Sequence, residues 1–194
     1  MERQRKNICK TYKYRLCTEE ERIIVRAHCD HVRVLIEDLV WKHEFGLKKG
    51  GYVAAIHTKR ALAEQCKEDF DVILVLDFAN AFNSCNRNFL MRLAVTAIPE
   101  MAPLAYWLYS EETELFLSTG STLISSEGVH QGCGLANLLF ALIMKFIMRH
   151  LPPEEVSVKG SYSDDGFTKS TTAAALRIFK TIVKLHPKPT SRLA

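Results

Sequence analysis

Apolar residues that recur every three or four positions predict amphipathic helices in the first part of the chain. The first set follows a capping box of Thr18 and Glu21 and consists of Ile24, Val25, Val32, Leu35, Ile36, Leu39 and Val40. This spacing predicts a long helix that ends near Trp41. Three glycines within residues 45–51 favour turns and interrupt the pattern. A second helix is expected over residues 52–66.

A continuous apolar run over residues 71–77 predicts a buried, central strand of a sheet, because the run is too short for a typical helix and is rich in β-branched residues. The last residue of this strand is a carboxylate, Asp77. Asn86 can cap a helix over residues 88–98. Pro103 can open a further helix, since the first turn does not need its missing N–H.

The following segment combines short strand patterns with one long apolar helix. Residues 115–117 and 122–124 predict a hairpin around the Thr-Gly-Ser sequence of residues 119–121. A polar, glycine-rich loop over residues 125–134 precedes a helix expected over residues 136–150. A Pro-Pro pair ends that helix, because proline donates no backbone hydrogen bond.

A second hairpin is expected in the last part of the sequence. A short strand over residues 156–158 precedes residues 162–168, in which the Asp165–Gly166 pair is expected to form the tight turn. A helix over residues 171–184 and a loose tail over residues 186–194 follow. This order of elements predicts an α+β fold with helices packed on one face of a small, mostly antiparallel sheet.

The composition is that of a globular protein and not of a disordered, fibrous or collagen-like chain. Of the 194 residues, 47% are hydrophobic and 25% are charged, and this length allows one domain of ordinary size or two very small ones. The formal net charge of +4 is too small to indicate a nucleic-acid partner by itself. Basic side chains gather in residues 3–15, which fit either a basic arm or a solvated, frayed terminus.

The sequence carries no pattern of export or membrane insertion. No secretory apolar stretch follows the basic N-terminus, and the apolar run of residues 138–144 is well short of the roughly 20 residues that span a bilayer. The six cysteines form no C-x-x-C pair, which favours reduced thiols. A nuclear or cytoplasmic location without membrane contact is therefore expected. His28, Cys29 and His31 lack a second ligand pair, so an ordinary helix is favoured there over a zinc site.

Three motifs carry candidate chemistry, and each has an ordinary structural alternative. Asp77 ends a buried strand, where a carboxylate can hold a metal ion or simply cap a helix. Residues 128–135 place glycines before an apolar helix, so the backbone can approach a phosphate or a base, although an ordinary loop has the same pattern. The adjacent carboxylates of Asp164 and Asp165 repel each other, which favours a cation between them and a third carboxylate. A tight turn explains Asp165 but not Asp164.

Together these motifs resemble the palm domain of reverse transcriptases, the RNA-directed DNA polymerases, and in particular those of retrotransposons that lack long terminal repeats (non-LTR retrotransposons). Residues 77–84 (DFANAFNS) are similar to motif A, residues 125–132 (SSEGVHQG) with Leu138-Leu139-Phe140 to motif B, and residues 162–165 (YSDD) to motif C. The resemblance implies a palm domain over residues 45–185, after a basic arm and amphipathic helix over residues 1–44.

The resemblance also implies an activity, which is template-directed nucleotidyl transfer to a primer 3′-hydroxyl with two Mg²⁺ or Mn²⁺ ions. Asp77 and Asp164 would hold the ions, Asp165 would support them, and the backbone carbonyl of Phe78 would add an oxygen. Mg²⁺ favours such a set, since it takes a few carboxylates together with water and phosphate oxygens. The implied partners are an RNA template, a DNA primer and deoxynucleoside triphosphates.

Further residues have roles that the resemblance implies around the nucleotide. Phe82 lies where the family places an aromatic ring that excludes the sugar 2′-hydroxyl, and it can also be a core residue. Gln131 would support the template or nucleotide through its amide, and Gly132 would leave room for the backbone. Tyr162 would pack beneath the primer end.

The sequence departs from the family pattern at several points. Gly134 stands where the family usually has proline, which loosens the turn. Arg22, Arg26 and Arg33 offer no match for the fingers residues that grip the triphosphate, and no thumb follows Leu185. These departures predict a truncated, retrotransposon-derived fragment with weak or no activity alone, unless a partner or flanking segment supplies fingers and thumb.

Two other functional classes remain compatible with the sequence. A non-catalytic module could bind nucleic acid or protein and keep the palm only as a scaffold, because a fold does not imply a function. The chain could also be a gene remnant that does not accumulate as a folded protein. The intact aspartates favour the enzyme.

Overall fold

The computed structural model describes residues 19–32, 35–36, 42, 44–68, 70–116, 121–130 and 132–185. The predicted basic arm, the loose tail, Gln131 and the turn of the first hairpin lie outside these described residues, as does Arg33. The first helix was predicted to continue to about Trp41, but it ends at His31 and Val32 lies in a turn. Most of the residues from there to Trp41 lie outside the described part of the chain.

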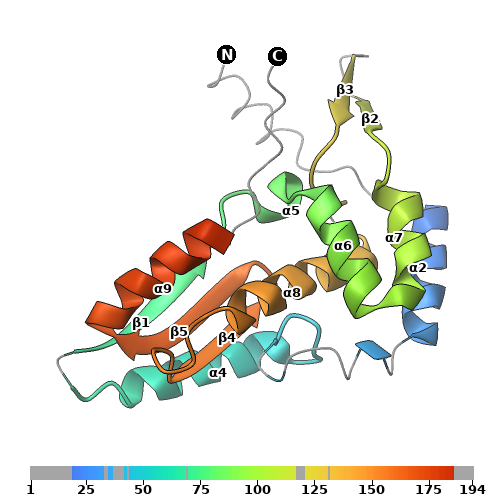
Figure 1. Cartoon of the computed structure of the whole chain (residues 1–194). Helices are drawn as coiled ribbons and strands as arrows, with labels where there is room; N and C mark the ends of the chain where they lie inside the picture. The colour runs from blue at the N-terminus through green and yellow to red at the C-terminus, as the bar shows by residue number, and fades with distance from the viewer. Residues whose placement is uncertain are drawn as a thin grey trace.

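The order of helices and strands agrees with the sequence pattern (Figure 1). The helices are α2 (Glu19–His31), α4 (Gly51–Glu64), α5 (Ala81–Ser84), α6 (Arg87–Ala97), α7 (Ala102–Tyr109), α8 (Gly134–Arg149) and α9 (Thr172–Leu185), with a short 3-10 helix, η1 (Pro99–Met101). The strands are β1 (Asp71–Asp77), β2 (Thr113–Phe116), β3 (Thr122–Ser125), β4 (Val158–Tyr162) and β5 (Asp165–Thr171). As predicted, Asn86 caps α6, where its side chain accepts a hydrogen bond from the Phe89 N–H.

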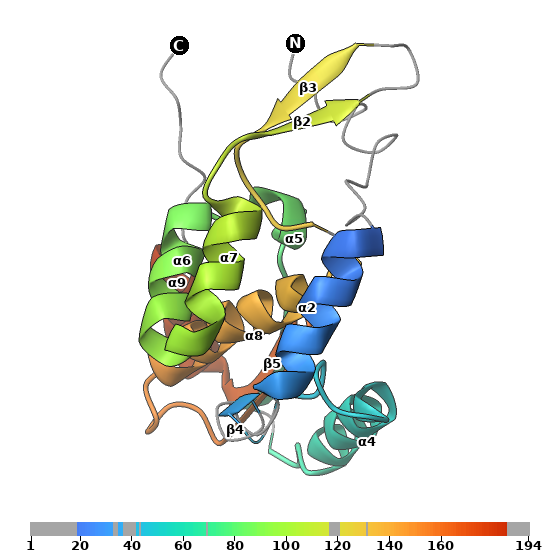
Figure 2. The same cartoon turned by 90° about the vertical axis from the view of Figure 1, so that its right-hand side faces the viewer.

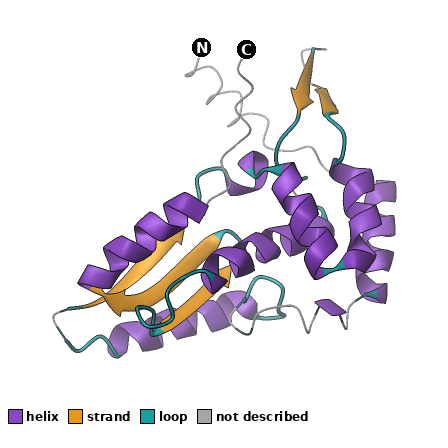
Figure 3. Cartoon of the chain, viewed as in Figure 1, coloured by secondary structure: helices purple, strands orange, loops and turns teal. Residues whose placement is uncertain are grey.

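The strands form two antiparallel sheets (Figure 3). The larger sheet has the order β1-β5-β4, and β2 pairs with β3 in a separate hairpin. In both views this hairpin projects away from the rest of the chain (Figures 1 and 2). The predicted α+β class with a small antiparallel sheet is confirmed.

The strand that precedes the second hairpin was predicted at the wrong position. Residues 156–158 were expected to form it, but β4 begins only at Val158 and continues to Tyr162. Gly160 weakens the strand signal of residues 158–162, because glycine is uncommon inside strands. Its place in the strand has a packing reason, because a Cβ at Gly160 would collide with the ring of Phe167. The missing side chain lets that ring lie across β4.

The turn of the second hairpin was also predicted wrongly. Asp165 and Gly166 do not form it, because both are paired in β5, opposite Tyr162 and Ser161 of β4. The turn consists of Ser163 and Asp164, and Ser163 has the positive φ of 55°. A Cβ at Gly166 would come within 2.9 Å of Met148 Cε in α8 and 3.1 Å of Leu76 Cδ1 in β1. The glycine therefore favours close packing of α8 on the sheet rather than a turn.

One hydrophobic core joins α8 to one face of the larger sheet. Met144 and Met148 of α8, Leu76 of β1 and Ile178 of α9 are buried in the same cluster. Phe167 follows Gly166 and points to the opposite face, where its ring stacks on Phe45 at 6.3 Å between centroids. Helices α8 and α9 thus pack on one face, as expected, and α4 with the segment before it covers part of the other.

Two further helical contacts complete the body of the protein. Figure 2 shows α2 crossing the start of α8, and α6 packs against both α7 and α8. Within the described residues, no helix is both long enough and apolar enough to cross a membrane.

Candidate functional site

The strand register brings motif A and motif C together at one end of the larger sheet. Asp77, the last residue of β1, is directly opposite Asp165, the first residue of β5. Asp165 is in turn opposite Tyr162, the last residue of β4. Because opposed residues of antiparallel strands point to the same face, Asp77 and Asp165 project from one side of the sheet.

This side of the sheet is open at β1. Val75 precedes Asp77 by two positions, points to the same face and is 58% exposed, and Asp77 itself is exposed. Leu76 lies between them, and its side chain is buried on the opposite face. The alternation therefore anchors the strand in the core while it presents the Asp77 carboxylate to solvent.

The third carboxylate belongs to the turn between β4 and β5. Asp164 is half-buried and directly precedes Asp165. The side chains of the described residues contain no group of three or more His, Cys, Asp or Glu that could hold a metal ion as they stand. His28 also belongs to no such group, and its Nε2 lies 2.9 Å from the carbonyl oxygen of Glu100.

The donor chemistry at this end of the sheet nevertheless fits a divalent cation. Two carboxylates occupy opposed positions on one face, and a third is the neighbouring residue. Carboxylate oxygens are the ligands that Mg²⁺ takes from proteins. The residue types at this end of the sheet are therefore those that Mg²⁺ takes, whereas the described side chains as they stand form no metal-binding group.

The residues after Asp77 enter a short helix that packs on α8. The carbonyl of Phe78 accepts a hydrogen bond of 3.2 Å from the Ala81 N–H. The ring of Phe82 stacks on Phe140 of α8, with centroids 4.9 Å apart and planes 16° apart. Phe82 is thus a half-buried core contact, and its predicted role beside the sugar stays a prediction.

Tyr162 has an aromatic partner that sequence reasoning missed. Its ring meets Tyr52 of α4 edge to face at 5.8 Å between centroids. Tyr52 is 62% exposed and therefore presents aromatic surface beside the end of β4. The only sequence signal was its position directly after the glycine-rich segment.

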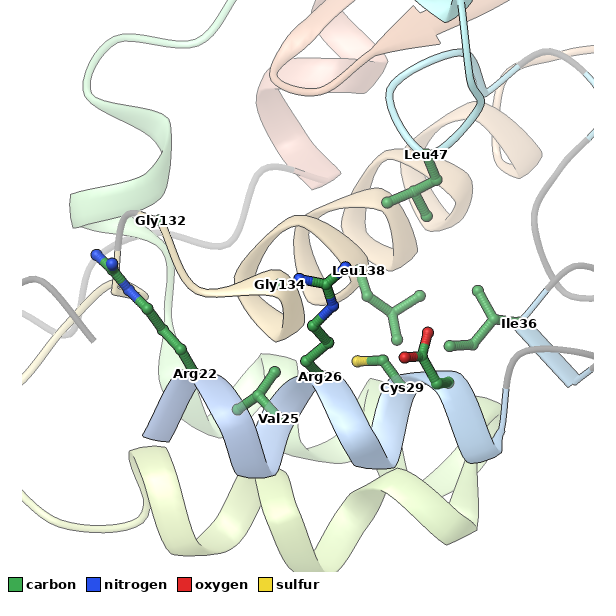
Figure 4. A pocket seen from close by; sticks show the side chains of 10 residues that line it. Arg22, Val25, Arg26, Cys29, Ile36, Leu47, Gly132, Gly134 and Leu138 are labelled. Atoms are coloured by element: carbon green, nitrogen blue, oxygen red, sulfur yellow. The ribbon is translucent and has the colours of Figure 1, made fainter. Parts of the chain in front are cut away.

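A cavity of about 410 Å³ lies between α2 and the start of α8, lined by Arg22, Arg26, Gly132, Gly134 and Leu138 among others (Figure 4). A Cβ at Gly132 would lie 3.8 Å from Nη2 of Arg22. The sequence analysis assigned no role to these two arginines. The part of α8 that lies beside them in the structure is distant along the chain, so no local pattern connects them. Gly134 is the first residue of α8, and a Cβ there would meet Val25 at an ordinary 3.7 Å.

The charged groups around this cavity are positive on balance. Helix α8 starts with Cys133 as its N-cap, and no side chain there accepts a hydrogen bond from the first turn. The N–H groups of that turn give the helix start a partial positive charge. Arg22 and Arg26 add two positive charges on the α2 side, and Asp30, which also lines the cavity, adds one negative charge.

Arg87 is a second residue that sequence reasoning missed. It is 7% exposed, and its guanidinium donates to the carbonyl oxygens of Gly128 at 2.8 Å, Glu111 at 3.0 Å, Ser125 at 3.0 Å and Glu127 at 3.2 Å. These bonds fix the first half of motif B and tie it to Glu111, in the loop before β2. Nothing in the local pattern around Arg87 indicated a buried position.

Comparisons with known proteins support the fold. Neither family models nor curated proteins gave a match. Among solved structures, apo telomerase from Candida tropicalis truncated from its C-terminal domain matches with a TM-score of 0.50 at 12% identity, over 89% of this chain and 38% of that chain. Apo telomerase from the same organism matches with a TM-score of 0.54 at 12% identity, over 90% and 34%. The chain thus spans about a third of these structures, and it has the fold of part of telomerase, an enzyme related to reverse transcriptases.

Proposed function

We propose that the chain is a reverse-transcriptase-like palm of the non-LTR retrotransposon type, whose acidic site serves template-directed nucleotidyl transfer. The observation that carries the proposal is the register that sets Asp77 opposite Asp165, next to the turn that contains Asp164. The telomerase-like fold supports the palm, and the likeness of motifs A, B and C supports the retrotransposon type.

The acidic residues would have different roles in metal binding at this site. Asp77 and Asp164 would hold two Mg²⁺ or Mn²⁺ ions, with support from Asp165 and from the carbonyl oxygen of Phe78. Bound cations of this kind neutralise the charge that develops on the attacking and leaving oxygens of a phosphoryl transfer. Asp77 lies on an open face, so a nucleotide and a primer end can reach it from solvent.

The nucleic acid would lie along the open face of the sheet and the start of α8. Arg22 and Arg26 would attract phosphate groups together with the N-terminus of α8. Gln131 and Gly132 would support the template or the nucleotide, and Tyr162 would contact the primer end. An RNA template, a DNA primer and deoxynucleoside triphosphates are the proposed partners.

The proposal is tested by titrating the chain with Mn²⁺ alone and measuring heat by isothermal titration calorimetry. We expect the parent chain to bind Mn²⁺ and the Asp77→Asn, Asp164→Asn double variant to bind at least about tenfold more weakly, because the carboxylates that would hold the ions are removed. Glu68→Gln, an exposed substitution outside the site, is the matched control. Equal affinity of parent and double variant would remove the metal site and the enzymatic proposal with it.

A second candidate, nucleic-acid binding without catalysis, is favoured by the two arginines at the cavity. Labelled RNA–DNA template–primer in EDTA, followed by fluorescence anisotropy, tests this candidate. Arg22→Ala, Arg26→Ala should weaken binding and lower the salt slope by about two, one for each lost phosphate contact. The matched control is Lys180→Ala, Lys184→Ala, which removes two exposed charges from α9. Binding of the duplex without any Mn²⁺ binding identifies the non-catalytic module.

A further inference from the structure

A buried carboxylate lies directly beneath the turn that carries Asp164. Glu44 is 2% exposed and forms an isolated parallel bridge with Ser161 of β4. The Phe45 N–H donates a hydrogen bond of 2.8 Å to the Ser161 carbonyl, which fixes this segment along β4. Glu44 therefore extends the sheet on the side away from β1.

Three donors surround the Glu44 carboxylate. The Gly46 N–H donates to Oε1 at 2.7 Å, the Ser161 hydroxyl donates to Oε2, and the Ser163 backbone N–H faces the same carboxylate and lowers its pKa. Burial of a carboxylate is costly unless hydrogen bonds replace its water. Here burial raises the pKa of Glu44, and these donors partly offset the increase.

One of these donors belongs to a residue with an uncommon backbone conformation. Ser163 has φ of 55°, in the left-handed region, which costs a non-glycine residue roughly 1–2 kcal/mol. Such a conformation persists only when surrounding contacts hold it. The approach of Glu44 and Gly46 to the Ser163 N–H is a contact of this kind.

The backbone of residues 44–46 also lies against the turn. A Cβ at Gly46 would lie 2.7 Å from the Ser163 nitrogen, so the glycine is needed for this approach. Glu44, Gly46 and Ser163 also border a common cavity of about 110 Å³, which Asn137 of α8 lines as well. Because part of its surroundings is open space, the turn depends more on its hydrogen bonds.

We propose that Glu44 is a positioning residue that holds the Ser163–Asp164 turn in the conformation that sets Asp164 beside Asp77. This inference rests on the proposed metal site, which it deepens by naming the group that supports it. Glu44 does not contact the metal; it acts through the backbone of Ser163. Residues behind a metal site that orient its ligands typically change metal affinity 10–100-fold when they are replaced.

The test uses Mn²⁺ affinity in the full chain and a rescue substitution. Glu44→Ala should weaken Mn²⁺ binding by about tenfold or more, and Glu44→Gln, which keeps one acceptor oxygen, by less. Ser163→Gly in the Glu44→Ala background should restore much of the loss, because glycine adopts positive φ without the steric cost. Glu64→Gln at the exposed end of α4 is the matched control and should bind Mn²⁺ as the parent does.

The outcomes separate this inference from the proposed function. If Glu44→Ala binds Mn²⁺ as tightly as the parent, or if Ser163→Gly restores nothing, Glu44 does not position the turn. If the parent itself does not bind Mn²⁺, the proposed function fails, and the metal role of Glu44 fails with it. Amide hydrogen exchange then still decides the structural part, since the Ser163 N–H should be protected in the parent and in Glu64→Gln and lose its protection in Glu44→Ala. An unprotected Ser163 amide in the parent contradicts this contact.

Discussion

Asp77 and Asp165 are paired residues of neighbouring antiparallel strands, and both carry a carboxylate on the same face of the sheet. Like charges at opposed positions repel, so this pair costs stability unless a cation lies between them. At the other end of the same strand, Asp71 instead makes an ion pair of 3.2 Å with Lys169. Without a bound cation, the carboxylate at one end of β1 therefore lowers the stability of the fold, whereas the carboxylate at the other end raises it.

Asp165→Asn should raise the stability of the chain and lower its affinity for Mn²⁺. Without divalent ions, removal of one repelling charge should increase the free energy of unfolding by about 0.5 kcal/mol. Asp71→Asn, at the other end of β1, removes an attractive pair and should lower that free energy by a few tenths of a kcal/mol. Urea denaturation in EDTA measures both. A loss of stability in Asp165→Asn contradicts the proposed repulsion.

Arg87→Ala should destabilise the chain by about 3 kcal/mol, because four backbone carbonyls lose a charged donor in a buried site. Arg87→Lys keeps the charge but not the planar set of donors, so its free energy of unfolding should lie between those of the parent and Arg87→Ala. Arg92→Ala, an exposed substitution on the same helix, should change stability by less than about 0.5 kcal/mol. Chemical denaturation compares the three, and equal losses for Arg87→Ala and Arg92→Ala would show that the loop does not depend on Arg87.

Gly128→Ala and Gly50→Ala should differ strongly although both glycines have similar backbone angles. Their φ values are 76° and 71°, so alanine is strained at both positions by roughly 1 kcal/mol. A Cβ at Gly128 would lie 2.5 Å from the backbone of Asn83, whereas a Cβ at Gly50 meets nothing within 4 Å. Gly128→Ala should therefore cost about 2 kcal/mol more, as overpacking does. Thermal melts of the two variants provide the measurement, and a similar decrease in both is the contrary result.

The raised pKa of Glu44 predicts a pH dependence of stability. Because burial favours the protonated carboxyl in the folded chain, its contribution is fully present below the ordinary glutamate pKa. That contribution decreases as the pH rises through the native pKa. Glu44→Gln cannot ionise, so the stability of the parent relative to this variant should fall with rising pH. Urea denaturation at several pH values above about 4 checks the sign; a difference that grows with pH contradicts it.

The sequence was informative wherever local pattern and tertiary environment agree. The apolar run of residues 71–77 predicted a strand, and Asn86 predicted the start of α6, because both signals lie within a few residues. The expected central, buried position of that strand was wrong, since β1 lies at the edge of the sheet and Leu76 is its one buried residue. The candidate acidic residues were also accessible from the sequence, since the repulsion between adjacent carboxylates such as Asp164 and Asp165 is itself a local signal.

Features that depend on distant partners escaped prediction. The Asp165–Gly166 pair has the composition of a turn, but packing of Gly166 beneath α8 placed it in a strand instead. Glu44 meets a hydroxyl 117 positions away, and Arg87 donates to a carbonyl 41 positions away. No window of neighbouring residues contains these contacts.

The order of strands in the larger sheet has a consequence for how the chain folds. The pairing of β1 with β5 joins Asp71 to Thr171, and β4 can pair with β5 without β1. Closing so long a loop is entropically costly, and contacts of large sequence separation slow folding. The local hairpin of β4 and β5 can therefore form early, whereas β1 must pair with a strand that lies about half the chain away. During synthesis, the two halves of the acidic site would meet only after β5 has emerged from the ribosome.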